Sequence, residues 1–185
     1  MAKKAVVLLA EGFEEVEAVT PIDYLRRAGV DVTTAAIGGT AAVKGARGIQ
    51  VIADTTLAEL AGRAGEFDAV IVPGGMPGAA NLAASKEVSS LLTDMAAADK
   101  LVCAICASPA VVLAPLGLLS GKKFTCYPDM EKQVSGGTWS EDKVVIDGGI
   151  ITSRSAGTAG DFAAAIISKL IDEAAGKKIA DAVLL

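Results

Sequence analysis

Short apolar runs alternate along this chain with longer segments in which apolar residues recur every three or four positions. The first pattern is typical of buried strands and the second of helices that pack on a sheet. Strands are predicted at 4–10, 30–37, 67–73, 101–105, 123–126, 139–147 and 149–153, with one or two short strands within 41–51. Helices are predicted at 14–27, at 81–98 in one or two pieces, at 107–113 and at 157–175. At most a short helix is predicted at 57–64, and a final helical segment at 179–185.

The alternation of strands and helices predicts an α/β fold with a mostly parallel sheet, right-handed crossovers and helices on both faces. No repeat, linker or change in composition marks a boundary, so residues 1–185 are expected to form a single domain. Ligands in such folds bind at the carboxyl ends of the strands. Turns of small residues follow strands at Glu11-Gly12, Gly74-Gly75 and Cys106-Ala107, and we expect the functional site among them.

The composition narrows the possible partners. Hydrophobic residues make up 52% of the chain and the mean hydropathy is +0.49, yet no apolar run approaches the roughly 18 residues of a membrane span. A net charge of −5 and an aromatic content of 4% disfavour nucleic acid as a partner. The apolar start at 5–9 is short for a signal peptide, and an odd number of cysteines suits a reducing compartment, so a cytoplasmic location is expected.

Cys106 is the first candidate for chemistry. The apolar run 101–105 stops at this residue, and small residues with Pro109 then begin a helical pattern. A strand that turns abruptly into a helix exposes the residue at the turn, as in a nucleophile elbow. The helix N-terminus is expected to lower the pKa of the Cys106 thiol. The alternative is that a free cysteine in an apolar context is a small buried hydrophobe.

Cys103 and Cys106 form a C-x-x-C pair, but a redox disulfide between them is disfavoured. Residues three apart in a strand point to opposite faces and lie roughly 10 Å apart. A disulfide needs Cα atoms within about 7 Å. Cys103 is therefore expected in the core. The chain has no histidine, which removes Cys-His and Ser-His catalysis and most transition-metal sites, and no metal site is predicted.

The Gly74-Gly75 turn lacks the motifs of nucleotide-binding loops. Glycine instead allows a backbone N–H to approach a reacting carbonyl, and the N–H groups of Gly75 and Ala107 would form an oxyanion hole. Acidic residues follow the first strand, and they suit a helix N-terminus. One of them would serve catalysis if it were partly buried and protonated. Helical spacing allows either Glu14 or Glu17 to face inward and leaves that choice open.

The motifs together resemble the ThiJ/PfpI superfamily, in the branch of the parkinsonism-associated protein DJ-one and its bacterial homologues. The resemblance is carried in order by the stretches 6–19 (VVLLAEGFEEVEAV), 25–30 (LRRAGV), 72–81 (VPGGMPGAAN), 104–109 (AICASP) and 152–154 (TSR). It implies a flavodoxin-like domain related to class I glutamine amidotransferases, and a homodimer.

The resemblance also assigns roles to residues of this chain. It implies that Cys106 is the nucleophile and that Glu17 is the protonated carboxyl hydrogen-bonded to its sulfur. It places the oxyanion donors at Gly75 and Ala107. An arginine that reaches the neighbouring subunit's pocket corresponds to Arg47, with Arg27 nearby.

The chain departs from the family pattern at three places. Tyr127 stands where many members have a histidine, and a phenol is a poor general base near neutral pH. The segment 153–157 (SRSAG) replaces a more usual Gly-Pro-Gly turn, and Ser108 lies beside the elbow. These differences disfavour a peptidase and are expected to alter the rim of the pocket.

The resemblance implies a cofactor-free glyoxalase that converts a small 2-oxoaldehyde to a 2-hydroxy acid, or a deglycase acting on glycated protein. An alternative from another class is a peroxide-responsive sensor or chaperone that uses the same cysteine. A glutamine-amidotransferase-like activity suits the elbow but not the absence of histidine.

Overall fold

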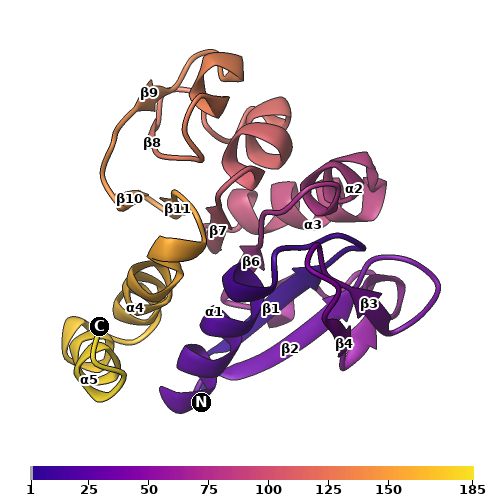
Figure 1. Ribbon diagram of the computed structural model, residues 1–185, viewed down its shortest axis with the longest axis horizontal. Helices are drawn as coiled ribbons and strands as arrows, with labels where there is room; N and C mark the ends of the chain where they lie inside the picture. Colours follow the sequence, from indigo (N-terminus) through magenta and orange to yellow (C-terminus); the bar gives the residue numbers. More distant parts are fainter. Residues whose placement is uncertain (1) are drawn as a thin grey trace.

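The central sheet has seven strands in the order β10-β11-β7-β6-β1-β2-β5 (Figure 1). The computed structural model describes residues 2–185. All neighbouring pairs in this sheet are parallel except β10 and β11, which are antiparallel. The strands are β1 (Lys4–Leu9), β2 (Asp31–Ala36), β5 (Thr55–Thr56), β6 (Ala69–Val72), β7 (Leu101–Ile105), β10 (Val144–Asp147) and β11 (Ile150–Ser153). The predicted mostly parallel sheet is confirmed.

Helices cover both faces of the sheet, as predicted. They are α1 (Glu15–Arg27), α2 (Gly78–Ala84), α3 (Lys86–Ala97), α4 (Ala159–Leu170) and α5 (Glu173–Ala182). One core lies between the sheet and α3, and the other lies between the sheet and helices α1 and α4, which lie side by side (Figure 1). Residues Ala5 to Leu9 of β1 are all fully buried, because side chains on both of its faces contact a core.

Short elements surround this framework. Two small sheets pair β3 (Ala42–Lys44) with β4 (Gln50–Ile52), and β8 (Lys123–Phe124) with β9 (Thr138–Trp139). The short helical turns are η1 (Leu57–Leu60), η2 (Ala64–Glu66), η3 (Pro109–Leu113), η4 (Ala114–Leu116), η5 (Met130–Gln133) and η6 (Ala156–Thr158). No helix in the described part of the chain is long and apolar enough to cross a bilayer.

The predicted helix at 157–175 is wrong in its length, because the chain forms two helices there. The carboxylate of Asp172 accepts a hydrogen bond from the Ala175 N–H at 2.8 Å and so caps a new helix, α5. Gly176 lets α5 approach α4 closely, since a Cβ at this position would collide with Ser168.

The predicted strand at 139–147 is likewise two strands, β9 and β10, in different sheets. A turn separates them, in which the Ser140 hydroxyl donates to Asp142 at 2.6 Å. The segment after Cys106 is also less regular than predicted. It consists of the five-residue turn η3 followed by the 3₁₀ turn η4, with a proline near the start of each.

Strand order creates a switch point beside β1. The chain passes from β1 to β2 on one side, and β6 then pairs with the other side of β1. In parallel sheets the loops on either side of such a switch leave a crevice at the carboxyl ends of the strands. The loops after β1, β6 and β7 therefore meet at one edge of the sheet.

Candidate active site

Cys106 follows β7 directly and has a left-handed backbone conformation, with φ of +65°. This conformation costs a non-glycine residue roughly 1–3 kcal/mol. Two backbone hydrogen bonds hold it: the Cys106 N–H donates to the Ser153 carbonyl at 3.0 Å, and the Tyr127 N–H donates to the Cys106 carbonyl at 2.8 Å. A strained residue at the end of a strand, fixed from both sides, is the geometry of a nucleophile elbow.

Glu17, on the first turns of α1, lies against the Cys106 thiol. Its side chain is hydrogen-bonded to Cys106, and only 1% of its surface is exposed. Its Oε2 atom also accepts a hydrogen bond from the Gly74 N–H at 2.9 Å. A Cβ at position 74 would lie 2.6 Å from Glu17 Oε2 and 2.7 Å from Cys106 Cβ, so only glycine permits this approach.

The structure separates the two acids that helical spacing leaves as alternatives. Glu17 turns into the site, whereas the Glu14 carboxylate caps α1 by accepting a hydrogen bond from the Glu17 N–H at 2.8 Å. Glu15 is also buried, but it faces the β3–β4 hairpin, where it accepts from the Arg47 N–H at 2.7 Å. Local periodicity could not distinguish these roles, because they depend on the hairpin and on the turn after β6.

Burial raises the pKa of Glu17 from its ordinary 4.5 to about 7. The hydrogen bond with Cys106 acts in the opposite direction, and the nearby charge of Glu14 raises the pKa further. Backbone N–H groups of Gly74 and Ala156 lower it. Both protonation states of Glu17 are therefore populated near neutral pH, as acid–base catalysis requires.

The expected low pKa of Cys106 is wrong. Burial raises the pKa of its thiol, and the charge of Glu17 and the hydrogen bond with that residue raise it further. The N–H groups of Ala107 and Gly75 act in the opposite direction and do not overcome these effects. The prediction considered the helix N-terminus alone, whereas desolvation and the neighbouring carboxylate dominate. The thiol is therefore mostly protonated near neutral pH, and a neighbouring base would assist its attack.

The two predicted oxyanion donors lie at the thiol. Both the Ala107 N–H and the Gly75 N–H form hydrogen bonds with Cys106. Gly75 has φ of +89°, and a Cβ there would collide with the backbone N of Glu14. The structure thus brings Cys106, Glu17, Gly75 and Ala107 together from the segments that follow the strands β1, β6 and β7.

The remaining predicted residues lie at the margin of this group or away from it. Tyr127 is 48% exposed and adjoins the elbow through its backbone N–H. Arg47 is exposed on the β3–β4 hairpin. Arg27 lies at the end of α1, about 15 Å along the helix axis from Glu17, and is paired with Asp23 at 2.6 Å. Neither arginine is among the groups that shift the pKa of the Cys106 thiol.

The other cysteines are free and buried. Cys103 has no exposed surface, which agrees with its expected place in the core, and burial raises the pKa of its thiol. Cys126 packs in the core on the opposite face of the sheet from the cluster that Cys106 contacts. In residues 2–185 no three His, Cys, Asp or Glu side chains are grouped so that they could hold a metal ion.

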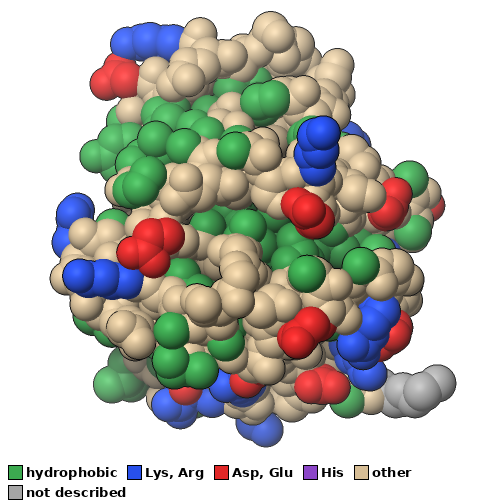
Figure 2. Space-filling model, turned by 90° about the vertical axis from the view of Figure 1, so that its right-hand side faces the viewer, with side chains coloured by type: hydrophobic (Ala, Val, Ile, Leu, Met, Phe, Trp, Pro, Cys, Tyr) green, Lys and Arg blue, Asp and Glu red, His purple; other side chains and the backbone are tan. Residues whose placement is uncertain are grey.

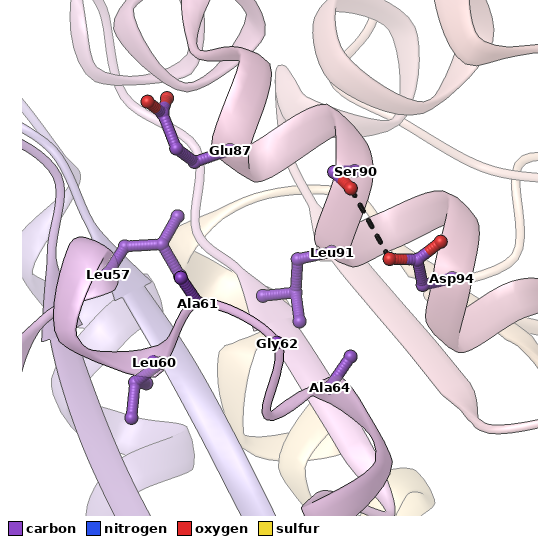
Figure 3. Close-up of a pocket in the computed structure, with 9 residues that line it drawn as sticks. All are labelled: Leu57, Leu60, Ala61, Gly62, Ala64, Glu87, Ser90, Leu91 and Asp94. Atoms are coloured by element: carbon purple, nitrogen blue, oxygen red, sulfur yellow. Dashed lines mark hydrogen bonds between the residues drawn. The ribbon is translucent and has the colours of Figure 1, made fainter.

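Apolar hollows occur on the surface of the molecule, and one cavity is clearly separate from the thiol. The face drawn in Figure 2 is hollowed along a band of hydrophobic side chains, with acidic groups beside it. A cavity of about 250 Å³ between η1 and α3 is likewise lined by apolar side chains with acidic groups beside them (Figure 3). Leu57, Leu60 and Leu91 form its apolar wall, and Glu87 and Asp94 belong to its α3 side. Neither Cys106 nor Glu17 lines it, so it is separate from the candidate active site.

The fold and the elbow define an α/β protein with a cysteine–carboxyl pair at the carboxyl edge of its sheet. The model of the DJ-1/PfpI family matches residues 3–169. Protein dj-1beta of Drosophila melanogaster is 44% identical over 180 residues, which cover 96% of this chain and 92% of that protein. The chain belongs to the DJ-1/PfpI family, as the sequence motifs indicated.

Two further relatives bear on chemistry. The glutathione-independent glyoxalase DJR-1.2 of Caenorhabditis elegans is 37% identical over 171 residues, covering 91% of this chain and 89% of that protein. The structure of oxidized Toxoplasma gondii DJ-1 superposes with a TM-score of 0.94 at 39% identity, covering 99% of this chain and 98% of that one.

Proposed function

We propose that this protein is a cofactor-free glyoxalase that converts a small 2-oxoaldehyde, such as methylglyoxal, to a 2-hydroxy acid. The observation that carries the proposal is the hydrogen-bonded pair of Cys106 and Glu17, with the N–H groups of Gly75 and Ala107 directed at the same sulfur. The name of the Caenorhabditis elegans relative supports the same reaction class.

The first step forms a bond between sulfur and the aldehyde carbon, C1. Ionised Glu17 accepts the thiol proton as Cys106 attacks, and the Gly75 and Ala107 N–H groups stabilise the developing oxyanion. Protonated Glu17 then gives the proton to this oxygen, which leaves a hemithioacetal and a carboxylate. Because the pKa of the thiol is raised, ionised Glu17 accelerates this step, which the small fraction of thiolate also undergoes without it, more slowly.

The second step is an internal redox rearrangement. Glu17 removes the proton from C1 and returns it to C2, while the hydroxyl proton on the C1 oxygen moves to the C2 oxygen. C1 is oxidised and C2 is reduced, so no external oxidant is required. Water then cleaves the resulting thioester, which releases the 2-hydroxy acid and regenerates the Cys106 thiol.

The test is lactate formation from methylglyoxal by the wild type and three variants. Cys106→Ala should abolish turnover, because the covalent step is lost. Glu17→Gln should lower it by about 10²–10⁴-fold, the usual contribution of an acid–base group. Cys126→Ala removes another buried thiol outside the site and serves as the control. Equal lactate production by the Cys106→Ala variant would show that the mechanism is wrong.

The same geometry would support release of early methylglyoxal adducts from glycated protein, because such adducts present a similar carbon to the thiol. A deglycase would release intact amine from a preformed adduct in the absence of free methylglyoxal. If the adduct disappears no faster than methylglyoxal dissociates from it without enzyme, the protein acts only on free aldehyde.

A second candidate function is a peroxide response or redox-regulated chaperone activity at Cys106. The similar structure from Toxoplasma gondii is that of oxidized DJ-1, which supports this candidate. The thiolate would attack a hydroperoxide, releasing an alcohol and leaving a sulfenic acid, which a second equivalent converts to a sulfinic acid. Mass spectrometry after mild peroxide treatment should place oxygen on Cys106. Equal oxidation of Cys103 and Cys126 would count against this function.

We further propose that the protein forms a homodimer through α1 and the β3–β4 hairpin. The Glu15 carboxylate joins these two elements. Apolar side chains that both elements leave exposed are Val16, Val19, Ile49 and Ile52. In such a dimer Arg47 and Arg27 would lie near the partner's pocket, which agrees with their place outside the site of their own chain.

The free thiols of all cysteines support action in the reducing cytoplasm.

A further inference from the structure

The peptide unit between Pro73 and Gly74, in the turn after β6, is hydrogen-bonded both to the turn after β7 and to Glu17. The unit between Pro73 and Gly74 is trans, so its carbonyl oxygen and its N–H point in opposite directions. Its oxygen accepts a hydrogen bond from the Ser108 hydroxyl, with Oγ and O 2.6 Å apart. Its N–H donates to Glu17 Oε2 at 2.9 Å. A continuous hydrogen-bonded path therefore runs from Ser108 through this peptide to Glu17.

We propose that Ser108 is a positioning residue: its hydroxyl holds the Pro73–Gly74 peptide unit so that the Gly74 N–H remains directed at Glu17. The inference rests on the proposed role of Glu17 as the base. No hydrogen bond joins Ser108 directly to Glu17, so the serine would act through the peptide.

The surroundings of the peptide show why it needs this restraint. It leads into Gly74-Gly75, and glycine without a Cβ leaves the backbone free to rotate. On the other side of the turn, the Gly74 carbonyl accepts a hydrogen bond from the Glu14 N–H at 2.9 Å. Ser108 has no exposed surface, so its hydroxyl cannot exchange this bond for one to bulk water. The serine thus fixes the peptide plane at the end where Pro73 leaves β6.

The hydrogen bond also polarises the peptide. A donor at the carbonyl oxygen strengthens the N–H of the same unit as a donor, by roughly 10–30% in cooperative chains. A stronger Gly74 N–H favours the ionised form of Glu17. The other groups that face this carboxyl are the Glu14 carboxylate, the Cys106 thiol and the Ala156 N–H. The Ser108 hydroxyl is hydrogen-bonded to the Pro73 carbonyl and to none of these three groups, so its effect on Glu17 can be isolated.

The test measures the titration of Glu17 directly, by NMR of protein labelled with ¹³C at the glutamate side-chain carboxyls, with Glu17→Gln to assign the signal. Ser108→Ala should raise the midpoint of the Glu17 titration by about 0.5 pH unit. The activity–pH profile should move in the same direction, with kcat lowered below pH 7 and KM little changed. Ser108→Thr keeps the hydroxyl and should restore both. Ser89→Ala removes a hydroxyl on α3 that donates to the backbone carbonyl of Ser85, the N-cap of that helix, and should change neither.

Ser108→Gly provides a second variant without the hydroxyl if alanine disturbs the fold, and urea unfolding identifies such a disturbance. A Glu17 titration that is unchanged in both the alanine and glycine variants would overturn the proposal. An equal change in the threonine variant would also overturn it, because the hydroxyl would then be irrelevant. If the wild type makes no lactate, the proposed function fails, while the NMR titration still decides the role of Ser108.

Discussion

The raised pKa of Glu17 predicts a particular dependence of stability on pH. The pKa is about 7 in the folded protein, against an ordinary 4.5. Because the folded state binds the proton more tightly, the stability contributed by protonated Glu17 is complete below pH 4.5. It is lost as the pH rises through about 7. The difference of about 2.5 between 7 and 4.5, at ~1.36 kcal/mol per pKa unit, corresponds to about 3 kcal/mol of unfolding free energy.

Glu17→Gln isolates this contribution, because glutamine resembles the protonated carboxyl and does not titrate. The free energy of unfolding of the variant, relative to wild type, should increase by about 3 kcal/mol between pH 4.5 and 8.5. Urea unfolding curves at intervals of pH measure it. Glu141→Gln, at an exposed glutamate, is the control and should show no such trend. A difference between Glu17→Gln and wild type that is constant across this range would refute the assignment of a buried, neutral-pH titration to Glu17.

Other perturbations of the same region have equally definite outcomes. Glu17→Gln removes a negative charge that raises the pKa of the Cys106 thiol. Because the thiolate fraction then increases, alkylation of this thiol by iodoacetamide at pH 8 should accelerate roughly tenfold. An unchanged rate would show that the charge of Glu17 does not act on Cys106. Gly74→Ala places a Cβ 2.6 Å from Glu17 Oε2, so it should lower the unfolding free energy by about 1–3 kcal/mol and depress lactate formation, measured by urea unfolding and turnover. Val19→Asp should convert the proposed dimer to a monomer in light scattering, and a monomeric wild type would contradict that interface.

The sequence predicted the strands best where their burial is complete. The runs at 4–10, 67–73 and 101–105 correspond to β1, β6 and β7, whose side chains contact cores on both faces. The prediction of helices from the sequence failed where a local cap interrupts a continuous helical pattern. Asp172 starts α5 inside an apparently single helix. The two-residue strand β5 gave no usable periodicity.

The candidate site was predictable in its residues but not in its electrostatics. The motifs and the family resemblance identified Cys106, Glu17, Gly75 and Ala107, which the fold brings together. The direction of the Cys106 pKa was wrong, because it depends on how deeply the elbow is buried and on a carboxylate from a distant helix. Such effects arise only from packing between segments far apart in the chain.

The role proposed for Ser108 had no usable signal in the sequence beyond its place beside the elbow. Its hydroxyl acts on a carbonyl 35 positions away, at the end of another strand. The contact depends on β6 and β7 being neighbours in the sheet, which follows from the strand order rather than from local pattern.

In the proposed reaction the aldehyde carbon becomes bonded to Cys106, and Glu17 then moves the proton from C1 to C2. A single-turnover experiment tests it most directly, with stoichiometric ¹³C-labelled methylglyoxal followed by NMR. The Glu17→Gln variant should accumulate a hemithioacetal signal that is absent from the Cys106→Ala variant, while the wild type proceeds to lactate. Lactate formed by the Cys106→Ala variant, or a hemithioacetal signal that persists in it, would rule out this reaction.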